Sequence, residues 1–143
     1  MRKNNIAMSL AICLCLTLTA CTGKLTTIRP TLITRIVAEE LATGIKTEHH
    51  RKTNPQLDEL MDELVLQMER QYKHTSMCND SGEYLYEASF YMGDKLELNV
   101  WIHSDGSVCK NGKYYILSEK AESTKLSVDL EKWSDFIYFS PEK

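Results

Sequence analysis

The feature that most constrains this chain is an uncharged apolar run near its start, Ile6–Ala20. The run follows Arg2 and Lys3, and no acidic residue precedes it. A bilayer span needs about 20 apolar residues, so 15 are too few to cross and match the hydrophobic region of a secretory signal peptide. We therefore predict that residues 1–20 are removed, and that the remaining 123 of 143 residues form one domain rather than two.

The residues that end this run indicate how the chain is held at the cell surface. Leu18-Thr19-Ala20-Cys21 resembles the lipobox of bacterial lipoproteins, in which a small residue precedes the cysteine. That resemblance implies a cut just before Cys21 and a diacylglyceryl group on its thiol, with fatty acids such as palmitate as the acyl chains. Because two acyl chains anchor a protein stably where one does so only marginally, the implied location is the extracytoplasmic face of the cell membrane. The alternative is an ordinary signal peptide with a chance cysteine.

This reading divides the chain into three parts. Residues 1–20 are the lipoprotein signal peptide, residues 21–27 are the lipidated cysteine and a polar tether, and residues 28–143 are a single small domain. Loss of Arg2 and Lys3 leaves 15 basic side chains against 20 acidic ones, so the mature chain carries a net charge near −5. A nucleic-acid-binding face needs clustered lysine and arginine. The sequence has no such cluster, and we predict no nucleic-acid partner.

Two cysteines, Cys78 and Cys109, remain once the signal is lost and Cys21 carries lipid. A pair of cysteines in an oxidising compartment suggests a disulfide. This one would close a loop of 31 residues, and the chain-entropy relation gives a stabilisation of about 3–4 kcal/mol for such a loop. The alternative is two free, partly buried thiols, and the sequence leaves this choice open.

The first part of the domain is ambiguous between helix and strand over residues 31–43. Pro30 and Gly44 at its two ends, with apolar residues at helical spacing between them, suit a helix. The density of β-branched residues over Thr31–Val37 instead suits a strand. We favour a β-hairpin that turns near Gly44.

A clearer helix signal follows this hairpin. Asn54 can cap the helix, and Pro55 fits the first turn, where a missing N–H costs nothing. Acidic residues in the first turns suit the helix dipole. Apolar residues recur at three- and four-residue steps: Leu57, Leu60, Met61, Leu64, Val65, Met68 and Tyr72. The pattern predicts an amphipathic helix whose apolar face packs on a sheet.

Alternating residues then predict two antiparallel strands, Tyr84–Tyr91 and Leu96–His103, whose even-numbered residues face the core. A register change of one residue turns a strand over. To keep both apolar sets inside, we predict a three-residue loop, Met92–Asp94, that pairs Phe90 with Leu96.

Two hairpin turns and a terminal helix complete the predicted fold. Two turn sequences, Asp105-Gly106 and Asn111-Gly112, lie on either side of a short strand at Val108 and Cys109. With a turn at Asp105-Gly106, the predicted register places Cys109 opposite Ile102 and Ile102 opposite Tyr84. The tail places Leu126, Leu130, Trp133 and Phe136 at helical spacing and predicts a short helix that closes the sheet. The predicted fold class is α+β: an antiparallel β-sheet, made of an N-terminal hairpin and a C-terminal meander, packed against one main amphipathic helix.

This order of elements resembles small uncharacterised lipoproteins and secreted proteins of Gram-positive bacteria. The residues that carry the resemblance are Ile33–Val37, Thr53–Leu64 and Asp105–Tyr115. The resemblance covers most of the mature chain, but its patterns are shared by many small domains. It implies a fold and brings no catalytic residues with it.

Candidate catalytic and metal-binding residues are few. His49 and His50 are adjacent, so on a strand their rings point to opposite faces, which suits a metal site poorly. A Cys–His pair of Cys78 or Cys109 with His103 would need an activated thiolate beside a positioned base. We predict no metal, no cofactor and no catalytic residue.

Aromatic residues offer a binding surface instead. Trp101 and Tyr91 belong to the outer face of the predicted meander, where exposed rings could bind a peptide or a glycan. The alternative is that another element, such as the tail helix, covers them. We therefore expect a membrane-anchored, non-catalytic binding or accessory domain whose ligand is an unknown peptide, protein or cell-wall component. The alternative function is an envelope enzyme that uses Cys78 or a histidine.

Overall fold

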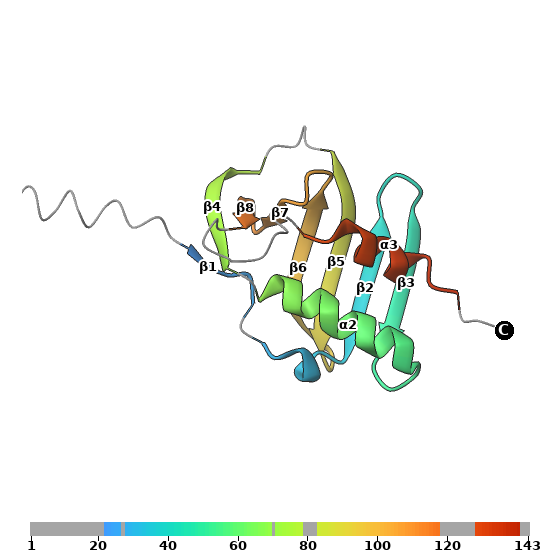
Figure 1. Cartoon of the computed structure of the whole chain (residues 1–143). Coiled ribbons are helices and arrows are strands. Elements are labelled where there is room, and N and C mark those ends of the chain that lie inside the picture. The colour runs from blue at the N-terminus through green and yellow to red at the C-terminus, as the bar shows by residue number, and fades with distance from the viewer. Residues whose placement is uncertain (1–21, 27, 70, 79–82, 118–127, 141–143) are drawn as a thin grey trace, which may run out of the picture.

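The computed structural model describes residues 22–26, 28–69, 71–78, 83–117 and 128–140. Within these residues one antiparallel sheet has the strand order β1-β4-β8-β7-β6-β5-β2-β3 (Figure 1). The strands are β1 (Thr22–Lys24), β2 (Arg35–Glu40), β3 (Ile45–His50), β4 (Gln71–Met77), β5 (Tyr84–Met92), β6 (Lys95–His103), β7 (Val108–Lys110) and β8 (Lys113–Leu117). The helical elements are the 3-10 turn η1 (Pro30–Leu32) and the helices α2 (Pro55–Met68) and α3 (Leu130–Ile137).

Both α-helices pack on the same face of the sheet (Figure 1). The alternation of the central strands accounts for this, because it places buried residues on that face: Ile36, Ala38, Tyr86, Ala88, Phe90, Leu98, Val100 and Ile102. The buried residues Met61, Leu64, Val65 and Met68 of α2 complete this core. The α+β prediction is confirmed, including the helix-covered antiparallel sheet.

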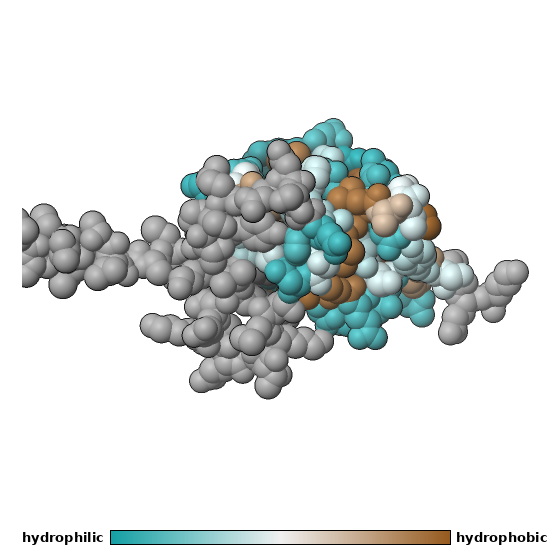
Figure 2. Space-filling model, turned by 90° about the horizontal axis from the view of Figure 1, so that it is seen from above, coloured by the Kyte–Doolittle hydropathy of each residue, from teal (hydrophilic) through white to brown (hydrophobic). Residues whose placement is uncertain are grey.

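The ambiguous segment after Pro30 is a hairpin, as favoured. Only Pro30–Leu32 is helical, and β2 pairs with β3 from Arg35↔His50 to Glu40↔Ile45. The connection turns at Gly44, whose φ is +70° and whose N–H donates to the Glu40 carbonyl at 2.8 Å. Glycine adopts this left-handed conformation without a steric penalty. At this end of the molecule, seen from above, a hydrophobic area lies among hydrophilic residues (Figure 2).

Helix α2 starts as predicted but ends earlier. The Asn54 side chain accepts hydrogen bonds from the N–H groups of Gln56 and Leu57, and Pro55 is the first helical residue. The helix ends at Met68, and Tyr72 belongs to strand β4, so its assignment to the helical stripe is wrong. The Met68 carbonyl accepts the N–H of Leu25 at 3.1 Å, a partner from outside the helix.

The same contact corrects the predicted tether over residues 21–27. Within its described part, β1 pairs with β4, and Leu25 is buried in the core. Residues 22–26 are therefore held by the sheet and by the end of α2 and are not a free spacer. The reason is tertiary: β4, which the sequence did not predict, offers β1 a pairing edge.

The register between β5 and β6 differs from the prediction. Gly93-Asp94 makes a two-residue turn, with Met92 opposite Lys95 and Tyr91 opposite Leu96. A register shift between Phe90 and Tyr91 then places Phe90 opposite Leu98 rather than Leu96. Such a β-bulge inserts one residue and restores the parity that a two-residue turn would break. The even-numbered residues from Tyr86 to Phe90 and from Leu98 to Ile102 are buried, as predicted, but a bulge achieves this and not a longer loop. The prediction is wrong for Leu96, which lies on the turn side of the bulge opposite Tyr91 and is 49% exposed.

The later turns hold their predicted places, with a shifted register. Asn111 and Gly112 both have positive φ and join β7 to β8. In the sheet, Ile102 faces Val108 and Tyr86, whereas Trp101 faces Cys109. The predicted pairs of Ile102 with Cys109 and with Tyr84 are therefore wrong. The bulge after Phe90 sets the register that places Ile102 opposite Tyr86, and a second shift between Tyr84 and Tyr86 places Tyr84 opposite His103.

The tail forms the predicted short helix, α3. Trp133 is fully buried and meets the ring of Phe90 edge-to-face, with centroids 6.0 Å apart. Its indole N–H donates to the buried Gln67 side chain of α2 at 3.2 Å. Leu126, predicted on the same stripe, lies outside the described residues. Helix α3 therefore extends the core over β2 and β3 on the face that α2 also covers.

Candidate functional site

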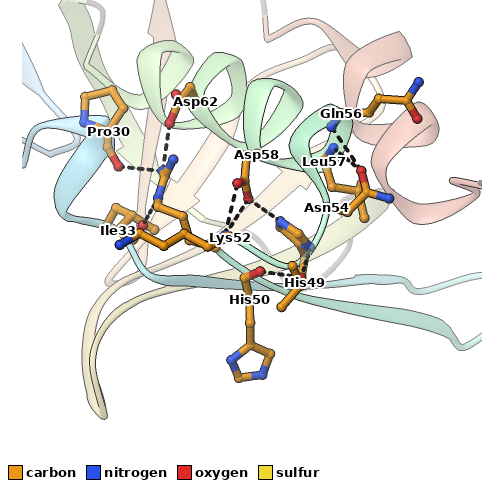
Figure 3. A network of polar contacts seen from close by, with 12 residues as sticks. Pro30, Ile33, His49, His50, Lys52, Asn54, Gln56, Leu57, Asp58 and Asp62 are labelled. Atoms are coloured by element: carbon orange, nitrogen blue, oxygen red, sulfur yellow. Dashed lines mark hydrogen bonds and ion pairs between the residues drawn. The ribbon is translucent and has the colours of Figure 1, made fainter.

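A network of polar contacts joins the end of β3 to the first turns of α2 (Figure 3). His49 is 3% exposed, and its Nε2 lies 2.7 Å from Oδ1 of Asp58. The two Asp58 oxygens also accept the Lys52 N–H, at 3.1 and 3.0 Å. Burial tends to raise the pKa of Asp58, but the hydrogen bonds from His49 and Lys52 outweigh it and lower that pKa below its ordinary value.

Arg51 makes the second half of this network. Its Nε donates to the Ile33 carbonyl at 2.7 Å, and its Nη2 donates to the Pro30 carbonyl at 2.8 Å and to Asp62 at 2.7 Å. One guanidinium thus joins η1 and the residue that follows it to the middle of α2. The Pro30 carbonyl also accepts the Ile33 N–H at 3.0 Å, so Arg51 adds a second bond to that carbonyl.

Thr53, His49 and Asp58 stand in the order of a hydroxyl–histidine–carboxylate relay. Thr53 Oγ1 lies 3.4 Å from Nδ1 of His49, and His49 contacts Asp58. The Thr53 hydroxyl, however, donates to the His50 carbonyl at 2.6 Å, and the His49 ring is buried. A nucleophile must give its proton to the base and reach a substrate. The arrangement therefore clamps the β3–α2 connection and lacks the features of a reactive centre.

A cavity of about 570 Å³ lies at the same end of the sheet. Three segments contribute to it: η1 with the start of β2, the end of β3 with the connection to α2, and the β5–β6 turn. The lining residues are Thr31, Thr34, Arg35, His50, Arg51, Lys52, Gly93 and Asp94. The position of these segments follows from the pairing of β2 with both β3 and β5.

Contacts with neighbouring side chains hold the Arg35 guanidinium in place. Its guanidinium lies over the Tyr91 ring, 3.8 Å from the centroid, and Nη1 donates to Glu48 at 3.1 Å. His50 Nε2 lies 2.8 Å from the same Glu48 oxygen. The bond from Arg35, and then that from His50, hold the pKa of Glu48 below its ordinary value. The carboxylate stays charged and holds Arg35 in place beside the cavity.

The sheet face opposite the helices carries aromatic and polar side chains, and we call it the open face. It consists of Arg35 and Val37 of β2, Glu87, Ser89 and Tyr91 of β5, and Glu97, Asn99, Trp101 and His103 of β6, with Tyr84 at its edge. Trp101 is 40% exposed and meets Tyr84 edge-to-face, with centroids 5.3 Å apart. Beside it, the Asn99 amide donates to Glu87 at 3.1 Å and to Ser89 at 3.0 Å.

The structure places several of the predicted site residues. Cys78 and Cys109 form a disulfide with Cα atoms 6.1 Å apart. Cys78 follows β4, and Cys109 belongs to β7, one strand further along the sheet beyond β8. The Cys78 N–H donates to the Gly112 carbonyl of the β7–β8 turn at 2.8 Å, and this bond holds Cys78 near Cys109. Cys21 lies outside the described residues.

The histidines are spread over the sheet. His49 is buried toward α2 and His50 points away from it (Figure 3), which confirms that the two rings occupy opposite faces. His103 belongs to the open face, where its ring meets Tyr84. The search for groups of three or more His, Cys, Asp or Glu that could hold a metal ion found none among the described residues.

Sequence reasoning missed the cationic residues of the cavity. The signal was present as the run His49-His50-Arg51-Lys52 just before the helix cap. Arg35 and Gly93 join this run only through strand pairing, so the cavity itself had no local signature.

Comparisons with protein-family models, with curated proteins and with solved structures found no match for this chain. No helix among the described residues is long and apolar enough to span a bilayer.

Proposed function

We propose that this chain is a lipoprotein anchored through Cys21 on the extracytoplasmic face of the cell membrane, and that its domain binds a peptide, protein or cell-wall component without catalysis. The lipobox-like sequence Leu18–Cys21 supports the anchor. Strand β1 begins at Thr22, directly after Cys21, so an acylated Cys21 would hold the sheet close to the membrane surface. The domain would then meet ligands at the cell envelope.

The exposed Trp101 is the observation that carries the binding proposal. Trp101 is 40% exposed and, with the neighbouring ring of Tyr84, presents an aromatic pair on the open face. Its contact with Tyr84 fixes the ring, and an amide, a hydroxyl and a carboxylate lie in the adjoining row of the open face. A fixed aromatic surface beside hydrogen-bonding groups suits a peptide or a saccharide, which present apolar faces and polar edges together.

The geometry favours binding over the alternative of an envelope enzyme. A bridged Cys78 has no thiol to act as a nucleophile. His49 is buried against Asp58, and the Thr53 hydroxyl is committed to a backbone carbonyl. These contacts support a structural role for the residues that an enzyme of this chain would most readily use.

The anchor is tested with Cys21→Ala. We expect the variant to be released from the membrane or to keep its signal peptide, whereas wild-type protein incorporates labelled palmitate and stays in the membrane fraction. A Cys78→Ala variant, which retains the lipobox, is the matched control and should remain lipidated. A Cys21→Ala chain that stays in the membrane at the mature mass would contradict the anchor.

The binding surface is tested with Trp101→Ala in the full chain purified in detergent. Soluble cell-wall glycan fragments and an envelope peptide digest are the probes, and retention on the immobilised protein is measured. We expect Trp101→Ala to abolish retention and Leu66→Ala, which removes a side chain that is 51% exposed on α2, to leave it unchanged. Equal retention by both variants would exclude the open face as the binding surface.

A further inference from the structure

We propose that the cavity between η1, the β3–α2 connection and the β5–β6 turn binds the phosphate group of a soluble phosphorylated molecule. Arg35, Arg51 and Lys52 line it, against Asp94 as the acidic lining residue. The chain as a whole is acidic, with 20 acidic and 17 basic side chains. Three cationic side chains around one cavity of such a chain mark a place where an anion is stabilised. The cavity shares Arg35 with the open face, but Trp101 does not line it.

The two arginines are held in place for this role. Glu48 accepts a hydrogen bond from Nη1 of Arg35, and Asp62 accepts one from Nη2 of Arg51. A guanidinium has five N–H donors in a rigid fork, so each side chain keeps donors after these contacts. Arg51 uses Nε and Nη2 in its bonds to the described residues, which leaves Nη1 for a ligand. A carboxylate that orients a guanidinium reduces the entropy lost when an anion binds.

Lys52 is the least expected residue of the cavity. Its φ of +71° is the left-handed conformation, which glycine or asparagine normally supplies. Asn111 occupies the corresponding conformation in the β7–β8 turn. Bonds from the Lys52 N–H to Asp58 hold the strained backbone, and among the described residues no carboxylate pairs with the Lys52 ammonium. Strain kept at a cationic residue beside a cavity indicates a functional reason for that residue.

The charge and size of the cavity indicate the ligand. A phosphate monoester carries about −1.5 to −2 charge at pH 7 and several acceptor oxygens, so it matches three cations better than a single carboxylate does. The volume of about 570 Å³ also leaves space for the rest of a small molecule beyond the phosphate. Strand β1, next to Cys21, lies at the opposite edge of the sheet from β3. If Cys21 is the anchor, this placement favours a soluble molecule over a headgroup of the anchoring membrane.

The test is an NMR titration of the full chain in detergent micelles with inorganic phosphate and with glycerol 3-phosphate. We expect saturable changes in the chemical shifts of the Lys52, Thr34 and Gly93 amides. Because Lys52→Gln removes one close charge contact, its Kd for phosphate should be at least about tenfold weaker. Lys46→Gln removes an exposed lysine of β3 that does not line the cavity, and should change Kd less than about twofold. Asp94→Asn should tighten binding, because it removes the acidic lining residue.

Lys52→Gly separates a binding role from a structural one. It relieves the left-handed strain, so its midpoint of thermal unfolding should not fall below that of the wild type, whereas phosphate binding should weaken as it does in Lys52→Gln. Shifts that do not saturate, an equal loss in Lys46→Gln, or tighter binding of acetate than of phosphate would overturn the proposal. Weaker association of Lys52→Gln with phosphatidylglycerol vesicles would overturn the assignment to a soluble ligand.

Discussion

Replacing Asp58 with alanine should remove the contact that joins the end of β3 to α2. The change leaves His49, 3% exposed, without its carboxylate partner and removes both acceptors of the Lys52 N–H. Leaving a buried hydrogen-bonding group without its partner costs about 1–3 kcal/mol, and more when the lost partner is charged. The Asp58 side chain is 23% exposed, so solvent screens part of this cost. We therefore expect a loss of about 2–3 kcal/mol in the free energy of unfolding.

Asp62→Ala is the matched control, one turn further along the same helix. Asp62 also pairs with a cation, at the same 2.7 Å, but it is 40% exposed. Arg51 keeps its bonds to two backbone carbonyls when Asp62 is removed. We expect a cost of about 0.5–1 kcal/mol, the value of a surface ion pair. The carboxylate, the helix and the 2.7 Å distance are shared, whereas the burial and the partners of the carboxylate differ.

The assay is urea unfolding of the full chain followed by tryptophan fluorescence. Trp133, which is fully buried, reports on unfolding in a Trp101→Phe background. A double-mutant cycle of His49→Ala with Asp58→Ala should give a coupling energy of at least about 1 kcal/mol. The reasoning is refuted if Asp58→Ala costs no more than Asp62→Ala, or if the two replacements are additive.

The pH dependence gives the same pair a second test. Because the folded pKa of Asp58 is below its ordinary value, its contribution is present above the unfolded pKa of about 3.9 and lost as the pH falls through the folded value. The difference in free energy of unfolding between the wild type and Asp58→Asn should therefore shrink between about pH 4 and pH 2. A difference that stays constant over this range would show that the charge of Asp58 is not what stabilises the fold.

Three further changes test other parts of the fold by the same unfolding assay. Val100→Ala should cost about 1–3 kcal/mol, since the side chain is fully buried under α2, and a cost below about 0.5 kcal/mol would contradict the even-numbered core face. Cys109→Ser opens the 31-residue loop closed by Cys78 and should cost about 3–4 kcal/mol, an effect that disappears if both proteins are compared in reductant. Asn54→Ala removes the acceptor of two helix N–H groups and should cost about 1 kcal/mol, with Asn54→Asp retaining most of the stability.

Features set by neighbouring residues could be predicted from the sequence. The start of α2 depends on Asn54 and Pro55, and the β7–β8 turn depends on Asn111 and Gly112, because capping and left-handed backbone are decided within a few residues. The core face of β5 and β6 followed from alternation, since successive strand residues point to opposite faces. These local rules were enough for the fold class and for most of the elements.

Features that depend on distant partners came only from the tertiary structure. Strand β4 has no strong strand pattern of its own, and its pairing with β1 and β8 brought Cys78 within reach of Cys109. A two-residue turn alone would place the apolar residues of β5 and β6 on opposite faces of the sheet, and the bulge between Phe90 and Tyr91 brings them to the same core face. The phosphate-site candidate joins Arg35, Lys52 and Gly93, which lie far apart in sequence and meet only because β2 pairs with both β3 and β5. Strand pairing is a long-range interaction, so its partners and register are set by the packed sheet and not by the residues along one strand.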